Sequence, residues 1–174
     1  DQDDQQAFEW YRRAAEQGHA DAQYYLFGCY NNGEGVLPDD EEATKWLMRA
    51  GSQDHVGAEF MLAVCYDLGS GLKRDQEQSL MWMRRAAEGG HADAQFFLAE
   101  AYRDGGGVIQ DSKEAIKWYT HSAEQGHAGA QFILAACYRN GIGALKNDGE
   151  AVRWYAKAAE QGHADAQFFL ALSY

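Results

Sequence analysis

Five histidines recur at a fixed spacing and are the first candidates for a chemical role in this chain. They are His19, His55, His91, His127 and His163, each 36 residues after the one before. Imidazole is a frequent metal ligand and titrates near neutral pH. However, one zinc ion holds all its ligands at about 2.0–2.1 Å, which residues one repeat apart cannot achieve. We therefore interpret the histidines as structural residues at helix starts, and we expect no metal and no cofactor.

Cysteines and glycines also recur in register. The cysteines Cys29, Cys65 and Cys137 share one place in the repeat, where equivalent residues of packed helices lie about 9–10 Å apart. A disulfide needs Cα atoms within about 7 Å, so we interpret them as small buried apolar residues. The Gly-x-Gly pairs resemble phosphate loops, but a phosphate loop follows a strand and opens a helix. We interpret these pairs as turns between helices.

An active site is usually a constellation that occurs once. Nearly every residue of this chain with catalytic potential recurs in register instead, without a single Ser-His-Asp, Cys-His or paired-carboxylate set. This favours a protein that is not an enzyme. The rival class is a hydrolase acting on cell-wall or β-lactam-like substrates, which would need a single nucleophile that the sequence does not identify.

The repeat that carries these residues predicts paired helices. Tryptophans stand at positions 10, 46, 82, 118 and 154, again 36 residues apart, and such a period is typical of stacked supersecondary units. Ala94, Leu98 and Tyr102 follow helical spacing, which predicts a first helix over about 92–104 that glycine ends. Asp111 with Glu114 resembles a capping box and opens a second helix, which ends at Gly126.

The other copies repeat this pattern, with caps expected at Asp3, Asp39, Asp75 and Asn147. The sequence thus predicts an all-α chain of about ten helices, with each tryptophan largely buried on a second helix. We expect a single array over residues 1–174. Its units are roughly 1–18 (partial), 19–54, 55–90, 91–126, 127–162 and 163–174 (partial).

The shared motifs are Gly-x-Gly-Val-x-x-Asp, Ala-x-x-Trp, Ala-Ala-Glu-Gln-Gly and Ala-x-x-x-Leu. Together they resemble the SEL-1-like repeats, relatives of the tetratricopeptide repeats, over the whole chain. The resemblance implies a right-handed α/α superhelical solenoid whose first helices line the concave side. It also implies an adaptor that holds other proteins together in bacterial envelope, signalling or host-interaction systems, or in eukaryotic quality control of membrane proteins. One departure is apolar residues where the family often has asparagine, as at Ile133.

Positions that change between copies are the expected partner-binding positions, although drift on a solvated face would also vary them. An aromatic column on the same helices either contacts the partner or packs between successive helices. The expected partner-binding residues are Tyr24, Asn31, Phe60, Val64, Asp67, Phe96, Glu100, Arg103, Phe132, Arg139 and Phe168. Arg103 and Arg139 would suit an acidic segment of the partner, because guanidinium groups pair bidentately with carboxylates.

The net charge of −12 and pI of about 4.8 argue against nucleic acid as a partner. No apolar run approaches the roughly 18 residues of a membrane span, and both a bacterial cytoplasm and a periplasm or cell envelope are compatible with the composition. We expect a scaffold that binds a protein or peptide in the concave groove; the alternative is a dedicated regulator or immunity protein of one enzyme. The apolar C-terminal helix at 164–174 predicts self-association through uncapped ends.

Overall fold

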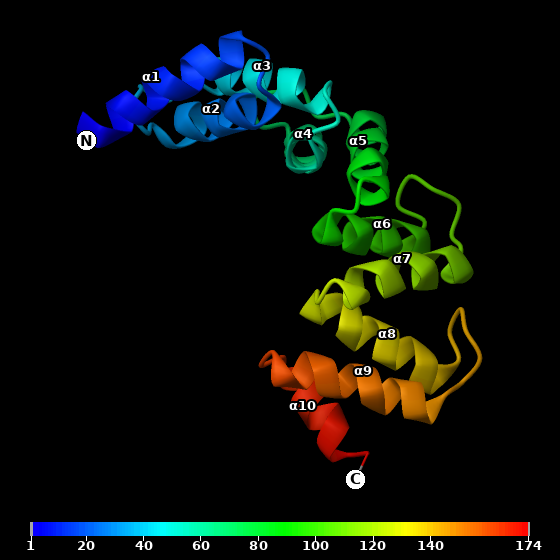
Figure 1. Cartoon of the computed structure of the whole chain (residues 1–174). Helices are drawn as coiled ribbons and strands as arrows, with labels where there is room; N and C mark the ends of the chain where they lie inside the picture. The colour runs from blue at the N-terminus through cyan, green and yellow to red at the C-terminus, as the bar shows by residue number, and fades with distance from the viewer. Residues whose placement is uncertain (1, 174) are drawn as a thin grey trace. The chain divides into compact units, whose positions relative to one another are not determined.

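The computed structural model describes residues 2–173, which form ten α-helices and no strand (Figure 1). The helices are α1 (Gln2–Glu16), α2 (Ala20–Asn32), α3 (Asp40–Gly51), α4 (Val56–Leu68), α5 (Gln76–Glu88), α6 (Ala92–Asp104), α7 (Ser112–Glu124), α8 (Ala128–Asn140), α9 (Asp148–Glu160) and α10 (Ala164–Ala171). This confirms the predicted helical repeat, and α6 matches the expected range of 92–104. Odd-numbered helices carry the tryptophans, and even-numbered helices begin after the histidines.

Local sequence explains where the helices begin and end. Asp111 caps α7 by accepting hydrogen bonds from the backbone N–H groups of Lys113 and Glu114. Gly105 ends α6 in the left-handed conformation, with φ of 76°, which glycine adopts at little steric cost. Asp54 stands where four other copies have glycine and is the one described non-glycine residue with positive φ, at 60°.

Asp3 does not cap α1, contrary to the expectation, because α1 already begins at Gln2. In the other copies the backbone N–H of the cap residue donates a hydrogen bond to a carbonyl of the preceding helix. Asp111, for example, donates to the Tyr102 carbonyl at 2.9 Å, across the loop from the preceding helix. Asp3 lies in the first turn of α1, so its backbone is helical and does not have the extended conformation that a cap requires.

The helices form two compact units, one ending at Gly89 and the other beginning at Gly90. Within each unit every helix contacts the next one along the chain. Their cores hold the alanine and leucine faces of the even-numbered helices, as the helical spacing predicts; Leu26, Leu62, Leu98 and Leu134 have no exposed surface. The proposed single array and the handedness of the superhelix remain predictions.

The tryptophan prediction is partly wrong. Trp46, Trp82 and Trp154 are buried, but Trp118 is half-buried and Trp10 is 67% exposed. Trp46 packs in one cluster with residues of α1 and α2, the two helices that precede its own. Among residues 2–173, α1 is the first helix, and no described helix covers the corresponding face of Trp10. Burial of this position is therefore a property of the stack and not of the single repeat.

Candidate partner-binding surface

The five histidines act as helix caps. The Nδ1 atom of each accepts a hydrogen bond from the backbone N–H three residues later, at 3.4, 3.0, 3.4, 3.0 and 3.3 Å in chain order. An unprotonated Nδ1 leaves the proton on Nε2, and at His55 that nitrogen lies 3.3 Å from a carboxylate oxygen of Asp21. Burial lowers the pKa of His91, and Asp93 opposes this. This arrangement bears out the structural interpretation.

The aromatic column packs against these histidine caps. The ring of Tyr24 stacks on His55 with centroids 4.7 Å apart, and Phe96 stacks on His127 at 4.5 Å. Phe132 and His163 repeat the arrangement at 4.6 Å. Phe60 is half-buried as well, whereas Phe168 on α10 is exposed. The column was expected either to contact a partner or to pack between successive helices. Tyr24, Phe96 and Phe132 pack against the histidine of the next repeat.

Sequence reasoning missed a buried ladder of glutamines. The Gln131 amide donates to the Ala123 carbonyl at 3.0 Å, and its oxygen accepts at 2.8 Å from Gln161, the residue that follows α9. The same two contacts hold Gln23. The sequence did contain a signal for this ladder, because glutamine recurs directly after the buried alanine of the even-numbered helices, as in Ala22-Gln23 and Ala130-Gln131.

Glu59 replaces glutamine at one step of this ladder and is only 3% exposed. Its carboxylate pairs with Nε of Arg85 at 2.8 Å, and Arg85 also binds Asp54 at 2.7 Å. Burial raises the pKa of Glu59, while Arg85 lowers it. This ion pair takes over the role that amide hydrogen bonds play in the other copies.

The variable position Arg103 is already paired within the chain. Its guanidinium contacts Glu100 at 2.6 Å and makes two bonds of 2.8 Å to Asp104. The hydroxyl of buried Tyr119 donates to the same Glu100 carboxylate. Burial, and then this hydrogen bond, raise the pKa of Tyr119. Arg103 therefore holds a local cluster together and is not a free cation.

Arg139 occupies the same place one repeat later and differs in its partners. Its guanidinium lies over the Phe169 ring, 4.5 Å from the centroid, and no carboxylate of residues 2–173 pairs with it. In the first unit, Asn31 and Asp67 at this place are exposed and Val64 is half-buried. Of the two arginines, only Arg139 remains available to an acidic group.

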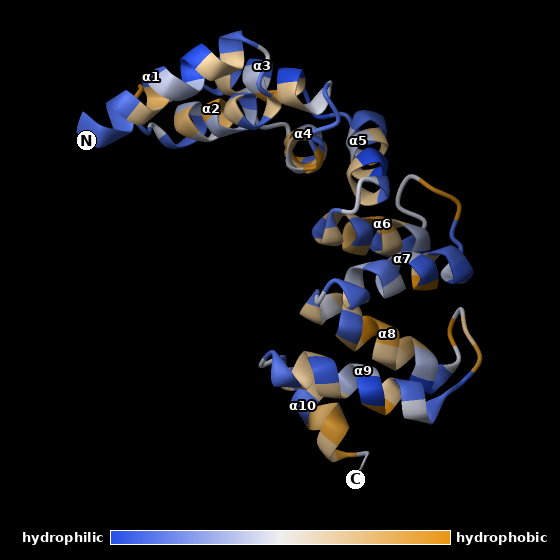
Figure 2. Cartoon of the chain, viewed as in Figure 1, coloured by the Kyte–Doolittle hydropathy of each residue, from blue (hydrophilic) through white to orange (hydrophobic). Residues whose placement is uncertain are grey.

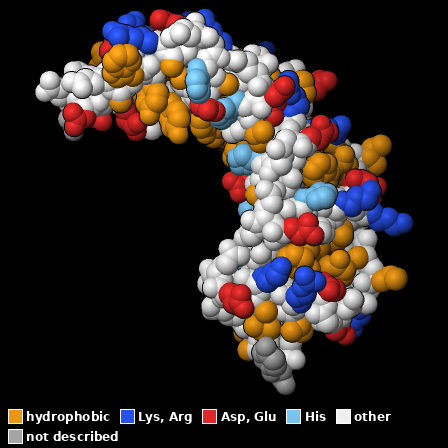
Figure 3. All heavy atoms as spheres, viewed as in Figure 1, with side chains coloured by type: hydrophobic (Ala, Val, Ile, Leu, Met, Phe, Trp, Pro, Cys, Tyr) orange, Lys and Arg blue, Asp and Glu red, His pale blue; other side chains and the backbone are white. Residues whose placement is uncertain are grey.

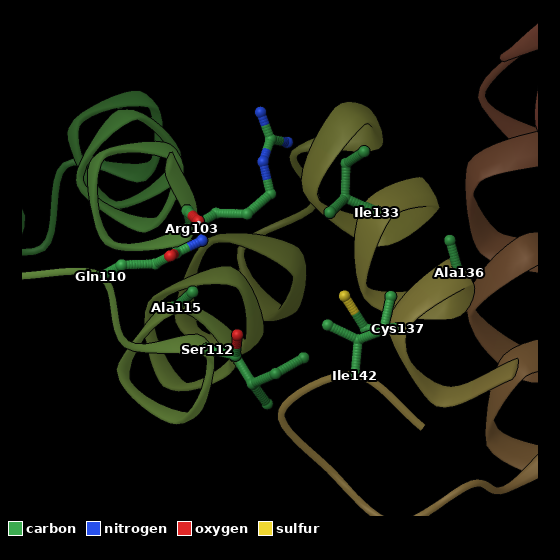
Figure 4. Close-up of a pocket in the computed structure, with 9 residues that line it drawn as sticks. Arg103, Gln110, Ser112, Ala115, Ile133, Ala136, Cys137 and Ile142 are labelled. Carbon is green, nitrogen blue, oxygen red and sulfur yellow. Dashed lines mark hydrogen bonds between the residues drawn. The ribbon is translucent and has the colours of Figure 1, made fainter. Parts of the chain in front are cut away.

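A cavity of about 290 Å³ opens beside Arg103 in the second unit. Figure 4 shows Arg103 and Gln110 on one side of it and Ile133, Cys137 and Ile142 on the other. Helix α7 contributes Ser112, Ala115 and Ile116, and α8 also contributes Ala136. This groove between two even-numbered helices, bordered by variable positions, is the candidate partner-binding site.

Exposed apolar residues in the loops are a second feature that the sequence analysis did not single out. Leu37, Ile109 and Leu145 hold the same place in three loops, and Ile109 and Leu145 are each 91% exposed. Figure 2 shows these hydrophobic stretches in the loops after α6 and α8. On the face seen in Figure 3, acidic and basic side chains are interspersed and form no continuous patch of one sign.

The cysteines and the potential metal ligands are the other reactive groups of the described residues. The three cysteines are free and buried, and burial raises the pKa of each thiol, away from the reactive thiolate. Within residues 2–173, no three His, Cys, Asp or Glu side chains are grouped as metal ligands. None of the helices there has the length and apolar character of a membrane span.

Addition of a chelator is expected to leave the melting temperature unchanged. The histidine Nδ1 atoms are occupied by backbone N–H groups, and structural metal sites make stability depend on the metal. Thermal unfolding with and without EDTA measures this. A clear drop in melting temperature with EDTA would contradict it.

The model of the Sel1 repeat matches residues 1–19, 20–55, 56–91, 92–127 and 128–163. The chain therefore belongs to the Sel1 repeat family, whose members generally act as non-enzymatic scaffolds for protein interactions. Comparison with curated protein sequences gives no match.

Solved structures agree with this assignment. A Sel1 repeat protein from Oxalobacter formigenes is 37% identical with a TM-score of 0.94; the match covers 97% of this chain and 49% of that one. A protective antigen of uropathogenic Escherichia coli strains with an SLR fold is 35% identical with a TM-score of 0.85, covering 91% and 34%. The chain thus spans about half and about a third of these two proteins. An immunity protein from Pseudomonas aeruginosa is 26% identical with a TM-score of 0.57, covering 93% and 59%.

Proposed function

We propose that this chain is a non-enzymatic interaction module that binds a partner protein through its even-numbered helices, as the resemblance to the family implies. The observation that carries the proposal is the open cavity between α6 and α8, bordered by the variable residues Arg103 and Ala136. Interfaces commonly place an apolar anchor in such a pocket and surround it with polar groups. A pull-down with the intact chain as bait tests the proposal, and failure to capture any protein specifically would contradict it.

Of the expected contact residues, we assign the binding of acidic groups to Arg139. Arg103 borders the site and is already paired with Glu100 and Asp104. Asn31, Val64 and Asp67 hold the corresponding positions in the first unit. Tyr24, Phe96 and Phe132 stack on the histidine caps. Phe60 is half-buried, and Phe168 is exposed on α10.

Arg139→Glu is expected to weaken binding of the captured partner by about 2 kcal/mol, since reversal replaces attraction to an acidic group by repulsion. The melting temperature should change little, because Arg139 forms no ion pair with the described residues. Isothermal titration calorimetry at two salt concentrations measures the loss.

Arg49→Glu is the matched control. Arg49 also lies over an aromatic ring, 4.4 Å from the Trp46 centroid, but it belongs to an odd-numbered helix. Its reversal should leave the affinity unchanged. Equal losses in the two variants would indicate a general charge effect and would contradict the assignment to Arg139.

A second candidate is a dedicated regulator of one enzyme. The similarity to the immunity protein from Pseudomonas aeruginosa favours it. A bait that captures one enzyme and inhibits it would support this candidate, whereas capture of several proteins without inhibition would support an adaptor.

Self-association remains a further prediction. Phe168 and Leu172 are 61% and 65% exposed on and just after α10, and exposed apolar patches favour association. Sedimentation over a range of concentrations measures it, and a strictly monomeric chain would contradict it.

A further inference from the structure

One tyrosine hydroxyl of the second unit has no hydrogen-bond partner, although its ring is buried. Tyr155 on α9 is 1% exposed, and its hydroxyl forms no hydrogen bond within residues 2–173. In that range the only fully enclosed polar side-chain atom without a partner is Nε1 of Trp82, so the Tyr155 hydroxyl reaches the surface. Because buried polar groups are nearly always hydrogen-bonded, this hydroxyl is available to a group from outside the chain.

The preceding repeat shows which group such a hydroxyl binds. Tyr119 stands 36 residues before Tyr155, is equally buried at 1%, and donates its hydroxyl hydrogen to the Glu100 carboxylate. The same carboxylate pairs with the Arg103 guanidinium at 2.6 Å. One carboxylate therefore joins a tyrosine hydroxyl to an arginine, and both contacts are strengthened by its charge.

The following repeat keeps the two binding groups and lacks the carboxylates. Arg139 and Tyr155 repeat the arginine and the tyrosine, whereas Ala136 and Asn140 replace the two acidic residues that pair with Arg103. The second repeat thus has a donor and a cation in the same positions, without an acceptor from its own helices.

The two tyrosine rings hold equivalent places in the stack. The ring centroids of Phe96 and Tyr119 lie 5.9 Å apart with the planes at 59°, and Phe132 and Tyr155 repeat this contact at 5.8 Å and 53°. The hydroxyls therefore occupy corresponding places. The methyl group of Ala136 stands where the preceding repeat has a carboxylate side chain.

Arg139 borders the same place as the Tyr155 hydroxyl. Its guanidinium carbon lies over the ring of Phe169, 4.5 Å from the centroid, and Phe169 stacks on Tyr155 with centroids 5.6 Å apart. Burial raises the pKa of Tyr155, and the charge of Arg139 opposes this rise, as a cation near a hydroxyl does.

We propose that Tyr155 and Arg139 together bind a carboxylate side chain of the partner protein, an aspartate or a glutamate, in the place that Glu100 takes in the preceding repeat. This inference rests on the proposed function and adds the hydroxyl as the second binding group. The hydroxyl donates a hydrogen bond to the carboxylate, and the guanidinium supplies the compensating charge. A neutral amide of the same shape gains less from both contacts.

Restoring the carboxylate within the chain tests this site without a partner. In Ala136→Glu, the hydroxyl and the guanidinium should hold the introduced carboxyl and lower its pKa about one unit below the ordinary glutamate value of about 4.3. Carbon NMR of a glutamate-labelled chain, compared with the unmodified chain, measures this pKa. Addition of Tyr155→Phe, which keeps the ring, should raise it again.

The captured partner tests which group occupies the site. Tyr155→Phe keeps the ring and the net charge and should weaken binding about tenfold, the usual effect of losing a hydrogen bond to a charged group. Tyr119→Phe is the matched control and should leave the affinity unchanged, because that hydroxyl is already bound within the chain. Ala136→Glu should also weaken binding about tenfold, since it fills the site from within, whereas the uncharged Ala136→Gln should weaken it less. Isothermal titration calorimetry measures these affinities.

An introduced carboxyl with an ordinary pKa that Tyr155→Phe does not change would overturn the site. Unchanged affinity of the partner for Tyr155→Phe would overturn its binding there and leave the interaction function intact, as would equal losses in Tyr155→Phe and Tyr119→Phe. The affinity measurements decide the proposal even where Ala136→Glu does not fold. If the introduced carboxyl is held but the bait captures no protein specifically, the proposed function fails, and with it the assignment of the site to a partner.

Discussion

Arg85→Met is expected to lower the free energy of unfolding by about 3–5 kcal/mol, because it leaves the buried carboxylate of Glu59 without its counter-charge. Glu59 is 3% exposed and binds Nε of Arg85 at 2.8 Å. Methionine retains an apolar stem over Trp82, whose ring centroid lies 4.7 Å from the Arg85 guanidinium carbon. Urea unfolding followed by circular dichroism measures the change.

The free energy of unfolding that Arg85→Met loses should increase with pH. Burial raises the pKa of Glu59 in the folded chain, and Arg85 opposes that rise, so removing Arg85 raises the pKa further. A carboxyl whose pKa is raised on folding favours the folded state at low pH, and that contribution is lost as pH rises through the folded pKa. The penalty of Arg85→Met should therefore be larger at about pH 8 than at about pH 5, both above the ordinary glutamate pKa of about 4.3. A pH-independent penalty would contradict this account.

Glu59→Gln in the Arg85→Met background is the matched control. The other described copies have glutamine at this position, and Gln23 donates to the Ala15 carbonyl at 3.1 Å. The corresponding carbonyl for residue 59 is that of Gly51. The double variant should recover most of the lost stability; if it is as unstable as Arg85→Met alone, the buried charge is not the cause.

Gly143→Ala is expected to lower the free energy of unfolding by about 2–5 kcal/mol, combining left-handed backbone strain of about 1–2 kcal/mol with overpacking of about 1–3 kcal/mol. Gly143 has φ of 71°, and a Cβ there would lie 2.2 Å from the Ser112 carbonyl oxygen. Gly35 and Gly71 approach backbone carbonyl oxygens at the starts of α1 and α3 in the same way, with 2.3 Å from an added Cβ to that of Asp4 and 2.9 Å to that of Asp40. The glycine thus sets the contact between a loop and the preceding odd-numbered helix.

Gly141→Ala separates strain from overpacking. Gly141 has the same φ of 71°, but the nearest atom to an added Cβ is the Lys146 Cβ at 3.6 Å, an ordinary contact. It should cost only the strain, about 1–2 kcal/mol. Comparable urea midpoints for the two variants would contradict the close-contact explanation.

The local structure was predictable because it depends on neighbours in sequence. The range of α6 and the cap at Asp111 both followed from helical periodicity and capping chemistry. The structural role of the histidines also followed, because equivalent residues of a repeat cannot converge on one ion. The cap made by Nδ1 did not follow, since histidine is not among the preferred cap residues.

The candidate site was predicted less well, because the partners of a side chain come from other helices. Arg103 and Arg139 look alike in sequence, yet Arg103 binds Glu100 and Asp104 while Arg139 lies over Phe169. The aromatic column appeared as exposed as the variable positions, but stacking on the histidine caps covers one side of Phe96 and Phe132.

The sequence by itself determined the helical repeat, its family and the identity of its framework residues, because periodicity, caps and glycines act within about one repeat. Only the tertiary structure decided which of the repeated positions remain open. Trp10 is exposed where Trp46 is buried, and the site beside Arg103 has an open volume of about 290 Å³ where the corresponding site beside Asn31 has about 10 Å³. Whether a position is open depends on the volume and contacts of side chains from three packed helices, which no single repeat specifies.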